Sequence, residues 1–209
     1  MSDGFVYWYE GDSNSDPAET LVAALEEAGL SLGNPSTGLV SSITNGPDSW
    51  GEQVFLTRGE LVESVAVVRR SGGGEVNFQF WLDGETDVFT RVRRPADGDV
   101  TVIEFGLDGM DQAQQTEVVE AVRGVMRRRW AECRGFVIDR SGATEDEDWD
   151  GIVIDASSRF TRWPDAFALH ADIAAAHTEL SAFPARQEPP LVVFDLQWTL
   201  GSAAPPEVR

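Results

Sequence analysis

The residues whose types and spacing come closest to a chemical site form an acidic run at positions 145–151. Asp146, Asp148 and Asp150 alternate ahead of a glycine, as in the opening of an EF-hand calcium loop, where alternate carboxylates face a hard cation. The twelfth position of such a loop holds Ser157 instead of the usual bidentate glutamate. We therefore expect a solvated acidic loop, with a calcium site as the weaker alternative.

Trp149 stands inside this acidic run. An aromatic ring flanked by carboxylates is either a core anchor with a solvated collar or a binding hot spot within an acidic rim, and we favour the core. The run as a whole is our candidate partner-binding patch, which comprises Glu145, Asp146, Glu147, Asp148, Trp149 and Asp150.

Other residue types that carry chemistry are poorly placed for it. His170 and His177 fall on one expected helix roughly 10 Å apart along its axis, too far to share a metal ion. Cys133, the single cysteine, lies in the apolar stripe of another expected helix, where burial is the default. The glycines at 72–74 precede no lysine and predict a hairpin turn. We expect no enzyme activity, no cofactor and no metal.

Three consecutive arginines, at 127–129, form a basic cluster of a kind that can contact phosphate. They fall near the C-terminal end of an expected helix, where cations complement the helix dipole, and Glu120 and Glu132 lie at pairing distances along that helix. Without a basic face or interleaved aromatic residues, this triplet does not predict nucleic-acid binding.

The charge balance is strongly acidic. Thirty-six carboxylates face sixteen arginines and no lysine, giving a formal charge of -20, and the first 57 residues hold nine acids and no base. Such a field repels nucleic acids and anionic membranes and attracts basic proteins. The chain starts with an acidic segment and has no apolar stretch long enough to cross a bilayer, so we expect a soluble, cytoplasmic protein.

The first elements are clearly signalled. Residues 5–9 predict a strand, and a helix follows with Asp16 as its N-cap, Pro17 in its first position and an apolar stripe that stops at Gly29. Residues 31–50 predict a loop region with a possible short strand at 39–43. In residues 53–70 a capping box competes with a valine-rich strand pattern, and both alternatives stay open.

An antiparallel meander is predicted next. Alternation of apolar and polar residues over 76–82, 86–94 and 100–107, with turns at Asp83-Gly84 and Asp97-Gly98, indicates three strands with one buried face. A helix over 112–134, capped by Asp111, would cover that face.

The remaining elements complete one fold. We expect strands at 136–139, 152–156 and 191–198 and a helix at 165–183. The fold class is α+β, an antiparallel sheet packed against two or three helices as a two-layer sandwich, in one domain over residues 1–200 with a flexible tail at 201–209.

These features favour an acidic protein-binding domain, similar in kind to an immunity protein or inhibitor, that neutralises a basic partner such as a nuclease toxin or a DNA-binding enzyme. The alternative is an enzyme whose carboxylates meet only in space, in a protein whose acidity reflects a salt-rich cytoplasm or a GC-rich genome.

Overall fold

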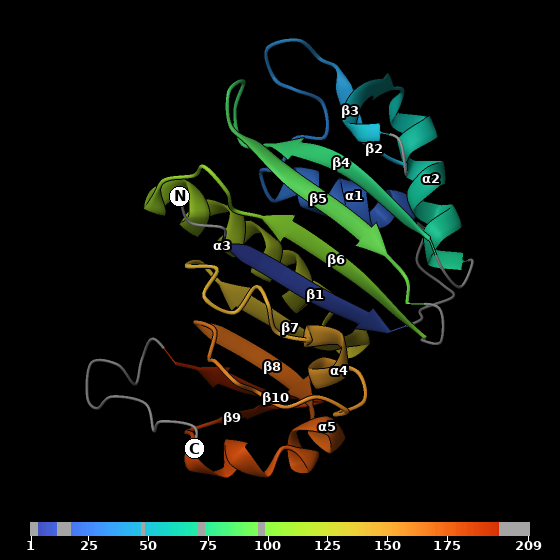
Figure 1. Cartoon of the computed structure of the whole chain (residues 1–209). Helices are drawn as coiled ribbons and strands as arrows, with labels where there is room; N and C mark the ends of the chain where they lie inside the picture. The colour runs from blue at the N-terminus through green and yellow to red at the C-terminus, as the bar shows by residue number, and fades with distance from the viewer. Residues whose placement is uncertain (1–3, 12–17, 47–48, 71–73, 96–98, 197–209) are drawn as a thin grey trace.

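A single ten-stranded sheet forms the centre of the computed structural model, which describes residues 4–11, 18–46, 49–70, 74–95 and 99–196. Neighbouring strands are antiparallel throughout and follow the order β3-β2-β4-β5-β6-β1-β7-β8-β10-β9 (Figure 1). The strands are β1 (Phe5–Gly11), β2 (Val40–Gly46), β3 (Ser49–Leu56), β4 (Glu75–Trp81), β5 (Asp87–Arg93), β6 (Val100–Gly106), β7 (Cys133–Asp139), β8 (Ala166–His170), β9 (Arg186–Glu188) and β10 (Leu191–Asp195). The predicted α+β class and antiparallel sheet are confirmed.

Three helices cover one side of the sheet, which we call the helix face: α1 (Ala18–Glu27), α2 (Arg58–Arg70) and α3 (Gln112–Arg128). Figure 1 shows α1 and α3 behind the strands. Their apolar side chains, such as Leu25, Leu61 and Val122, share a buried core with Trp8 and Phe105 of the central strands. Burial of this apolar surface is the main force that holds the helices to the sheet.

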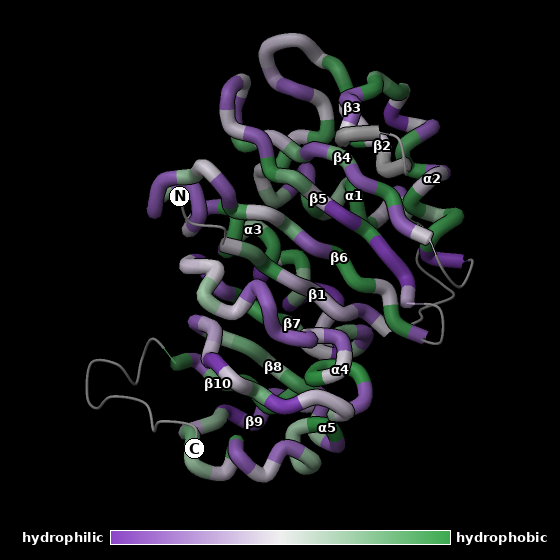
Figure 2. Tube along the Cα trace, in the orientation of Figure 1, coloured by the Kyte–Doolittle hydropathy of each residue, from purple (hydrophilic) through white to green (hydrophobic). Residues whose placement is uncertain are grey.

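The opposite side of the sheet is covered only in part. Two short helices, α4 (Trp149–Val153) and α5 (Ala171–Ala176), and a 3-10 turn at Thr178–Ala182 pack with a second core built on β6, β1, β7, β8 and β10. Figure 1 shows α4 in front of the sheet, and Figure 2 shows hydrophilic segments recurring along β4 and β5, which no helix of the described residues covers on this side. The sheet therefore has a covered half and an uncovered half on this second face.

Side-chain caps fix where two of the helices begin. Asp111 accepts hydrogen bonds from the backbone N–H of Ala113 and Gln114, and Gln114 Oε1 accepts from the N–H of Asp111, which is the predicted capping box of α3. Thr57 and Glu60 make the same reciprocal pair at the start of α2. The capping box therefore decides the ambiguous segment in favour of a helix.

A buried ion cluster joins the end of β1 to two helices. Glu10 is fully buried, and its carboxylate lies 2.6 Å from Arg129 Nε at the end of α3 and 2.8 Å from Arg69 Nη2 of α2. A buried carboxylate needs such partners because its desolvation is costly. Arg129 was predicted to complement the dipole at the C-terminal end of the helix, but its side chain points into the core instead.

That inward turn corrects the predicted length of α3. The helix ends at Arg128 instead of Arg134, a 3-10 turn follows at Trp130–Glu132, and Cys133 begins β7 opposite Glu10. Trp130 Nε1 donates to the carbonyl oxygen of Glu188 in β9 at 2.9 Å. Sheet pairing and this contact override a helical pattern that the local sequence alone would continue. Burial of Cys133 is as predicted, although in a strand.

Two further predictions in the C-terminal third are wrong. Residues 152–156 form no strand, because Asp148 caps a single helical turn that buries Trp149, Ile152 and Val153. Residues 165–183 are not one helix: their first part is β8, whose unbroken apolar run is typical of a strand covered on both faces and lacks the alternation of a half-exposed one. His170 ends this strand and His177 lies beyond α5, so they share no helix face.

The other predicted elements have mixed outcomes. The meander appears as β4, β5 and β6, and the strands at 5–9, 39–43, 136–139 and 191–198 appear as β1, β2, β7 and β10. Strands β3 and β9 were not predicted. The expected cap at Asp16 and Pro17, the turns at 72–74 and 97–98, and the tail at 201–209 lie wholly or partly outside the described residues. Within the described ranges, no helix is both long and apolar enough to cross a membrane.

Gly135 offers a test of how α4 docks on the sheet. A Cβ at this position would lie 2.6 Å from the carbonyl oxygen of Ala168 and 2.6 Å from Val153 Cγ1 of α4. We expect Gly135→Ala to lower the free energy of unfolding by about 1–3 kcal/mol, because the backbone or α4 must shift. Urea denaturation measures the change.

The matched control is Gly124→Ala in α3, where an added Cβ meets no heavy atom within 4 Å. Alanine should stabilise that helix by roughly 0.5–1 kcal/mol. Equal effects of the two substitutions would contradict close docking at Gly135.

Candidate functional site: the open face of the sheet

One row of side chains crosses the whole second face and changes character along its length. The strand register places Gln53, Ile43, Asn77, Arg91, Glu104 and Tyr7 in line with Val137, Phe167 and Phe194. The last three lie in the core under α4 and α5, and Tyr7 packs against that core, whereas β2, β3, β4 and β5 contribute no described residue to it. We call the uncovered part the open face, and its residues are Gln53, Phe55, Glu75, Asn77, Gln79, Phe89, Arg91, Arg93, Glu104 and Tyr7.

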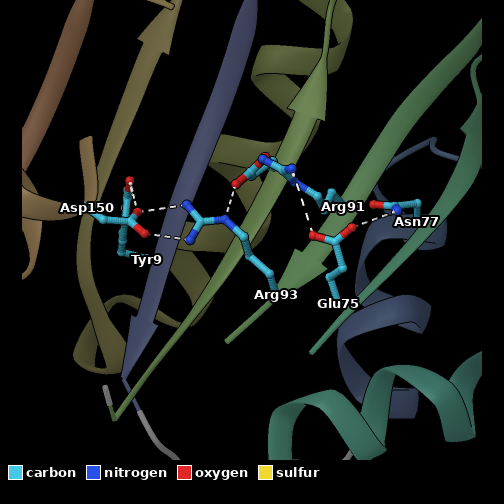
Figure 3. Close-up of polar contacts among 7 residues, drawn as sticks. Tyr9, Glu75, Asn77, Arg91, Arg93 and Asp150 are labelled. Carbon is cyan, nitrogen blue, oxygen red and sulfur yellow. Dashed lines mark hydrogen bonds and ion pairs between the residues drawn. The ribbon is translucent and has the colours of Figure 1, made fainter. Parts of the chain in front are cut away.

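Arg93 is the central side chain of the open face. Its two terminal nitrogens grip Asp150 of α4, with Nη1 2.5 Å from Oδ2 and Nη2 2.7 Å from Oδ1, while its Nε donates to Glu104 Oε1 (Figure 3). Tyr9 donates its hydroxyl hydrogen to Asp150 Oδ1 at 3.1 Å. A guanidinium fork is the geometry that carboxylates bind most strongly. Arg93 therefore fastens α4 to β5 and β6.

Arg91 extends the same network toward the far strands. Its Nε lies 2.7 Å and its Nη2 2.5 Å from Glu104 Oε2, and its Nη1 lies 3.9 Å from Glu75 Oε2. Asn77 Nδ2 donates to Glu75 Oε1 at 3.2 Å. Three carboxylates thus face two guanidiniums, which leaves one net negative charge in a connected chain of contacts (Figure 3).

Both tyrosines of the protein adjoin this network. Burial, followed by the nearby Glu104 carboxylate, raises the pKa of Tyr7 to about 12, and the Glu145 carboxylate adds to the shift. Burial, followed by Asp150, raises the pKa of Tyr9 well above 10. The Glu145 carboxylate, at the start of the acidic run, thus acts on a ring of the open face.

Amides and aromatic rings occupy the rest of the open face. Gln53 Nε2 donates to Gln79 Oε1 at 2.8 Å, and Gln79 Nε2 donates to Asp87 Oδ2 at 2.6 Å. Phe89 is 42% exposed and Phe55 is 58% exposed, which is unusual for rings of this size. The face thus combines braced polar groups with two accessible aromatic rings.

The predicted acidic run is held in place by Thr144. Buried Asp139 accepts hydrogen bonds from Thr144 N and Oγ1, both at 2.7 Å, and Thr144 O accepts from Trp149 Nε1 at 3.0 Å. Trp149 is 3% exposed and packs edge-on against Phe160. The favoured core position of Trp149 is confirmed.

The carboxylates of the run have different surroundings. Asp148 Oδ1 accepts from Gly151 N at 3.1 Å and its Oδ2 accepts from Ser158 Oγ, while Asp150 is bound by Arg93. Glu147 accepts from Thr161, and its side chain is 4% exposed. Asp146 is 87% exposed and 3.3 Å from Arg162, and Glu145 is exposed. Glu145, Asp146 and Asp148 are therefore exposed, whereas Glu147 and Asp150 are partly buried.

This arrangement disperses the candidate calcium ligands. Asp148 and Asp150 are engaged by α4 and by Arg93, and the residues the structure describes contain no group of three histidine, cysteine or acidic side chains placed to hold a metal ion. Cys133 is buried, which raises the pKa of its thiol to about 12, away from the reactive thiolate. His177 is buried as well, with Nε2 3.0 Å from Ile152 O.

Arg91 and Arg93 were not identified as site residues from the sequence. The signal that would have found them is the alternation of β5, in which Phe89, Arg91 and Arg93 share one face while Val88 and Val92 face the core. Two arginines on the solvated face of a strand usually indicate ordinary solvation, so only the pairing of β5 with β6 shows what they bind.

Comparisons with known proteins show little similarity. No protein-family model and no curated protein matches this chain. A solved structure, the Pseudomonas aeruginosa T6SS protein PA0821, aligns over 93% of this chain and 65% of its own, with 10% sequence identity and a TM-score of 0.48. A likeness of that size identifies neither the family nor the function of this chain.

The Arg93 network gives a stability prediction. Arg93→Gln should lower the free energy of unfolding by about 1–3 kcal/mol, because Asp150 and Glu104, 31% and 9% exposed, lose charged hydrogen bonds. Arg70→Gln is the control, since Arg70 and Glu63 are both 67% exposed and such a pair contributes at most ~1 kcal/mol. Chemical denaturation compares the two, and an Arg93 effect no larger than the control would show that the network carries no stability.

The raised tyrosine pKa values predict a loss of stability in alkali. The folded chain keeps its phenol protons above pH 10, where the unfolded chain begins to lose them, so stability is full below pH 10 and falls as pH rises toward 12. Ultraviolet absorbance of tyrosinate should remain near zero at pH 10 in the native protein. Tyr7→Phe should remove the step near pH 12, and a native tyrosinate signal at pH 10 would contradict burial of both rings.

Proposed function

We propose that this chain is a non-enzymatic, immunity-like or inhibitor-like binding domain that neutralises a basic protein through the open face and the acidic run beside it. The observation that carries the proposal is the combination of a preorganised, net negative network with two exposed aromatic rings on an uncovered sheet. Large apolar side chains framed by polar groups are typical of protein-binding surfaces.

Charge complementarity favours a basic partner. The arginines of the open face are already matched to carboxylates, whereas Glu145 and Asp146 are exposed in the acidic run that precedes α4. A chain of formal charge -20 adds a long-range field of the same sign. Such a surface attracts basic proteins and repels nucleic acids and anionic membranes.

The exposed rings supply the other part of an interface. Phe89 lies on β5 opposite Gln79, whose side chain is hydrogen-bonded to Gln53, and two residues before Arg91. A partner that covers the network therefore also covers this ring. Aromatic anchors surrounded by polar groups that exclude water carry much of the affinity at protein interfaces. The remaining residues of the acidic run act through α4, because Asp148 caps it and Asp150 ties it to Arg93.

The same geometry speaks against acid–base catalysis on this face. A general base needs an oxygen within reach of a substrate proton. Both oxygens of Glu104 accept from arginine, and both oxygens of Asp150 do so as well. These carboxylates hold the surface together, and all four of their oxygens already accept hydrogen bonds from arginine.

The test is capture of a basic protein, first of all a toxin-like product of a neighbouring gene. We expect Glu145→Lys/Asp146→Lys to lower the association rate constant by roughly tenfold or more, since electrostatic steering is lost. Phe89→Ala should mainly raise the dissociation rate. Biolayer interferometry at several ionic strengths measures both rates.

The matched control is Glu27→Lys/Glu117→Lys, which makes the same change in net charge at exposed acids of α1 and α3. Equal losses from the two double variants would show that only overall charge matters. An unchanged rate for Glu145→Lys/Asp146→Lys would remove the run from the interface. If acidity instead reflects a salt-rich cytoplasm, molar salt should raise the melting temperature, whereas salt slows charge-steered association.

A further inference from the structure

A polar cavity lies on the helix face, on the other side of the sheet from the open face. Its volume is about 370 Å³, near the lower end of small-molecule sites. Its apolar part is formed by Val119 of α3, Ile138 of β7 and Ala166 of β8, all nearly buried. The floor is therefore a piece of the core that α3 does not fully cover.

Four charged side chains complete the lining, and they come from four different segments. Arg123 projects from α3, Arg140 follows β7, Asp165 precedes β8 and Asp195 ends β10. The register of β10 and β8 pairs Asp195 with Ala166, and Asp165 O accepts from Leu196 N at 2.9 Å. Asp165 Oδ2 is fixed by Arg140 N at 2.8 Å. Both carboxylates thus line the same cavity.

Arg123 and Asp195 have opposite charges but are not joined. Within the described residues, neither side chain makes a hydrogen bond or an ion pair, although both line this cavity. Burial lowers the pKa of Arg123, Asp195 opposes that shift, and Arg127, Arg186 and Arg140 add to it. The Arg123 end of the cavity is therefore cationic, and it is an exception in a chain of formal charge -20.

We propose that this cavity binds a small zwitterion, a molecule with one carboxylate and one protonated amine such as a free α-amino acid. Arg123 and Arg140 would receive the carboxylate, and Asp195 and Asp165 the ammonium. The carbon skeleton would rest on Val119 and Ile138. Two guanidiniums and two carboxylates in one cavity supply charges opposite to both ends of such a ligand.

Ligands of a single charge fit this lining less well. A simple anion would gain the two arginines but lie beside two aspartates, and a simple cation would meet the reverse problem. A zwitterion satisfies both ends at once. It would also bridge Arg123 and Asp195, which the fold brings to one cavity without pairing them.

The experiment titrates the wild-type protein with each protein-forming L-amino acid by calorimetry and by NMR of backbone amides. At least one should bind and shift the amide signals of Val119, Ile138 and Ala166. Its N-acetyl derivative, which lacks the ammonium, and its amide, which lacks the carboxylate, should each bind roughly tenfold more weakly or worse. Absence of binding by every amino acid, or equal binding of the blocked forms, would overturn the proposal.

Two variants assign the binding to the cavity. Arg123→Gln and Asp195→Asn should each weaken binding by roughly tenfold or more while the melting temperature stays near that of the wild type, because neither side chain has a partner to lose. Arg70→Gln and Asp172→Asn, at exposed positions of α2 and α5, should bind like the wild type. Wild-type affinity in both cavity variants would overturn the assignment. Because the cavity and the open face lie on opposite sides of the sheet, either proposal can fail without the other.

Discussion

The grip of Arg93 on Asp150 and Glu104 is the interaction on which the form of the candidate site depends. It stands where the second face of the sheet passes from its covered to its uncovered half, and it joins α4 to β5 and β6 with one guanidinium. The acidic run cannot leave the sheet without breaking the bidentate, partly buried ion pair between Asp150 and Arg93. Glu145 and Asp146 are therefore presented from a fixed base, and a preorganised surface loses less entropy when a partner binds.

Half-coverage of the second face follows from the same rows of residues. Along one row of paired residues, the side chains change from glutamine and asparagine to valine and phenylalanine. The strands whose apolar residues face this side therefore determine where α4 and α5 pack. Gly135 lets α4 approach the sheet backbone. Polar side chains on the remaining strands prevent the helices from spreading further, because burying them without partners would cost more than the apolar contact contributes.

Local signals in the sequence predict the meander, the cap of α3 and the burial of Trp149, and they give the cap of α2 as one of two alternatives, since each depends on residues close together in the chain. The end of α3 could not be predicted, because it depends on Glu10, a residue 119 positions away from Arg129. The prediction of a helix where β8 lies was wrong for another reason. An apolar strand covered on both faces lacks the alternation that distinguishes a strand from a helix. The contacts of the open face depend on strand pairing. Arg91 and Arg93 could therefore be connected with Glu104 and Asp150 only once that pairing was known.

The absence of lysine takes on a structural meaning in this light. Arg93 reaches two carboxylates on different elements with a planar fork, and an ammonium group could not hold both in that geometry. Arg129 and Arg69 similarly bind Glu10 in the core, and Arg58 bridges Glu19 and Glu26 of α1. Many of the arginines thus neutralise particular carboxylates within the fold, so the charge excess falls on acids such as Glu145, which no arginine in the described part of the chain meets. Because arginines bind carboxylates inside the fold, the outer surface is more negatively charged than the composition alone indicates. This negative field is what would attract a basic partner at a distance.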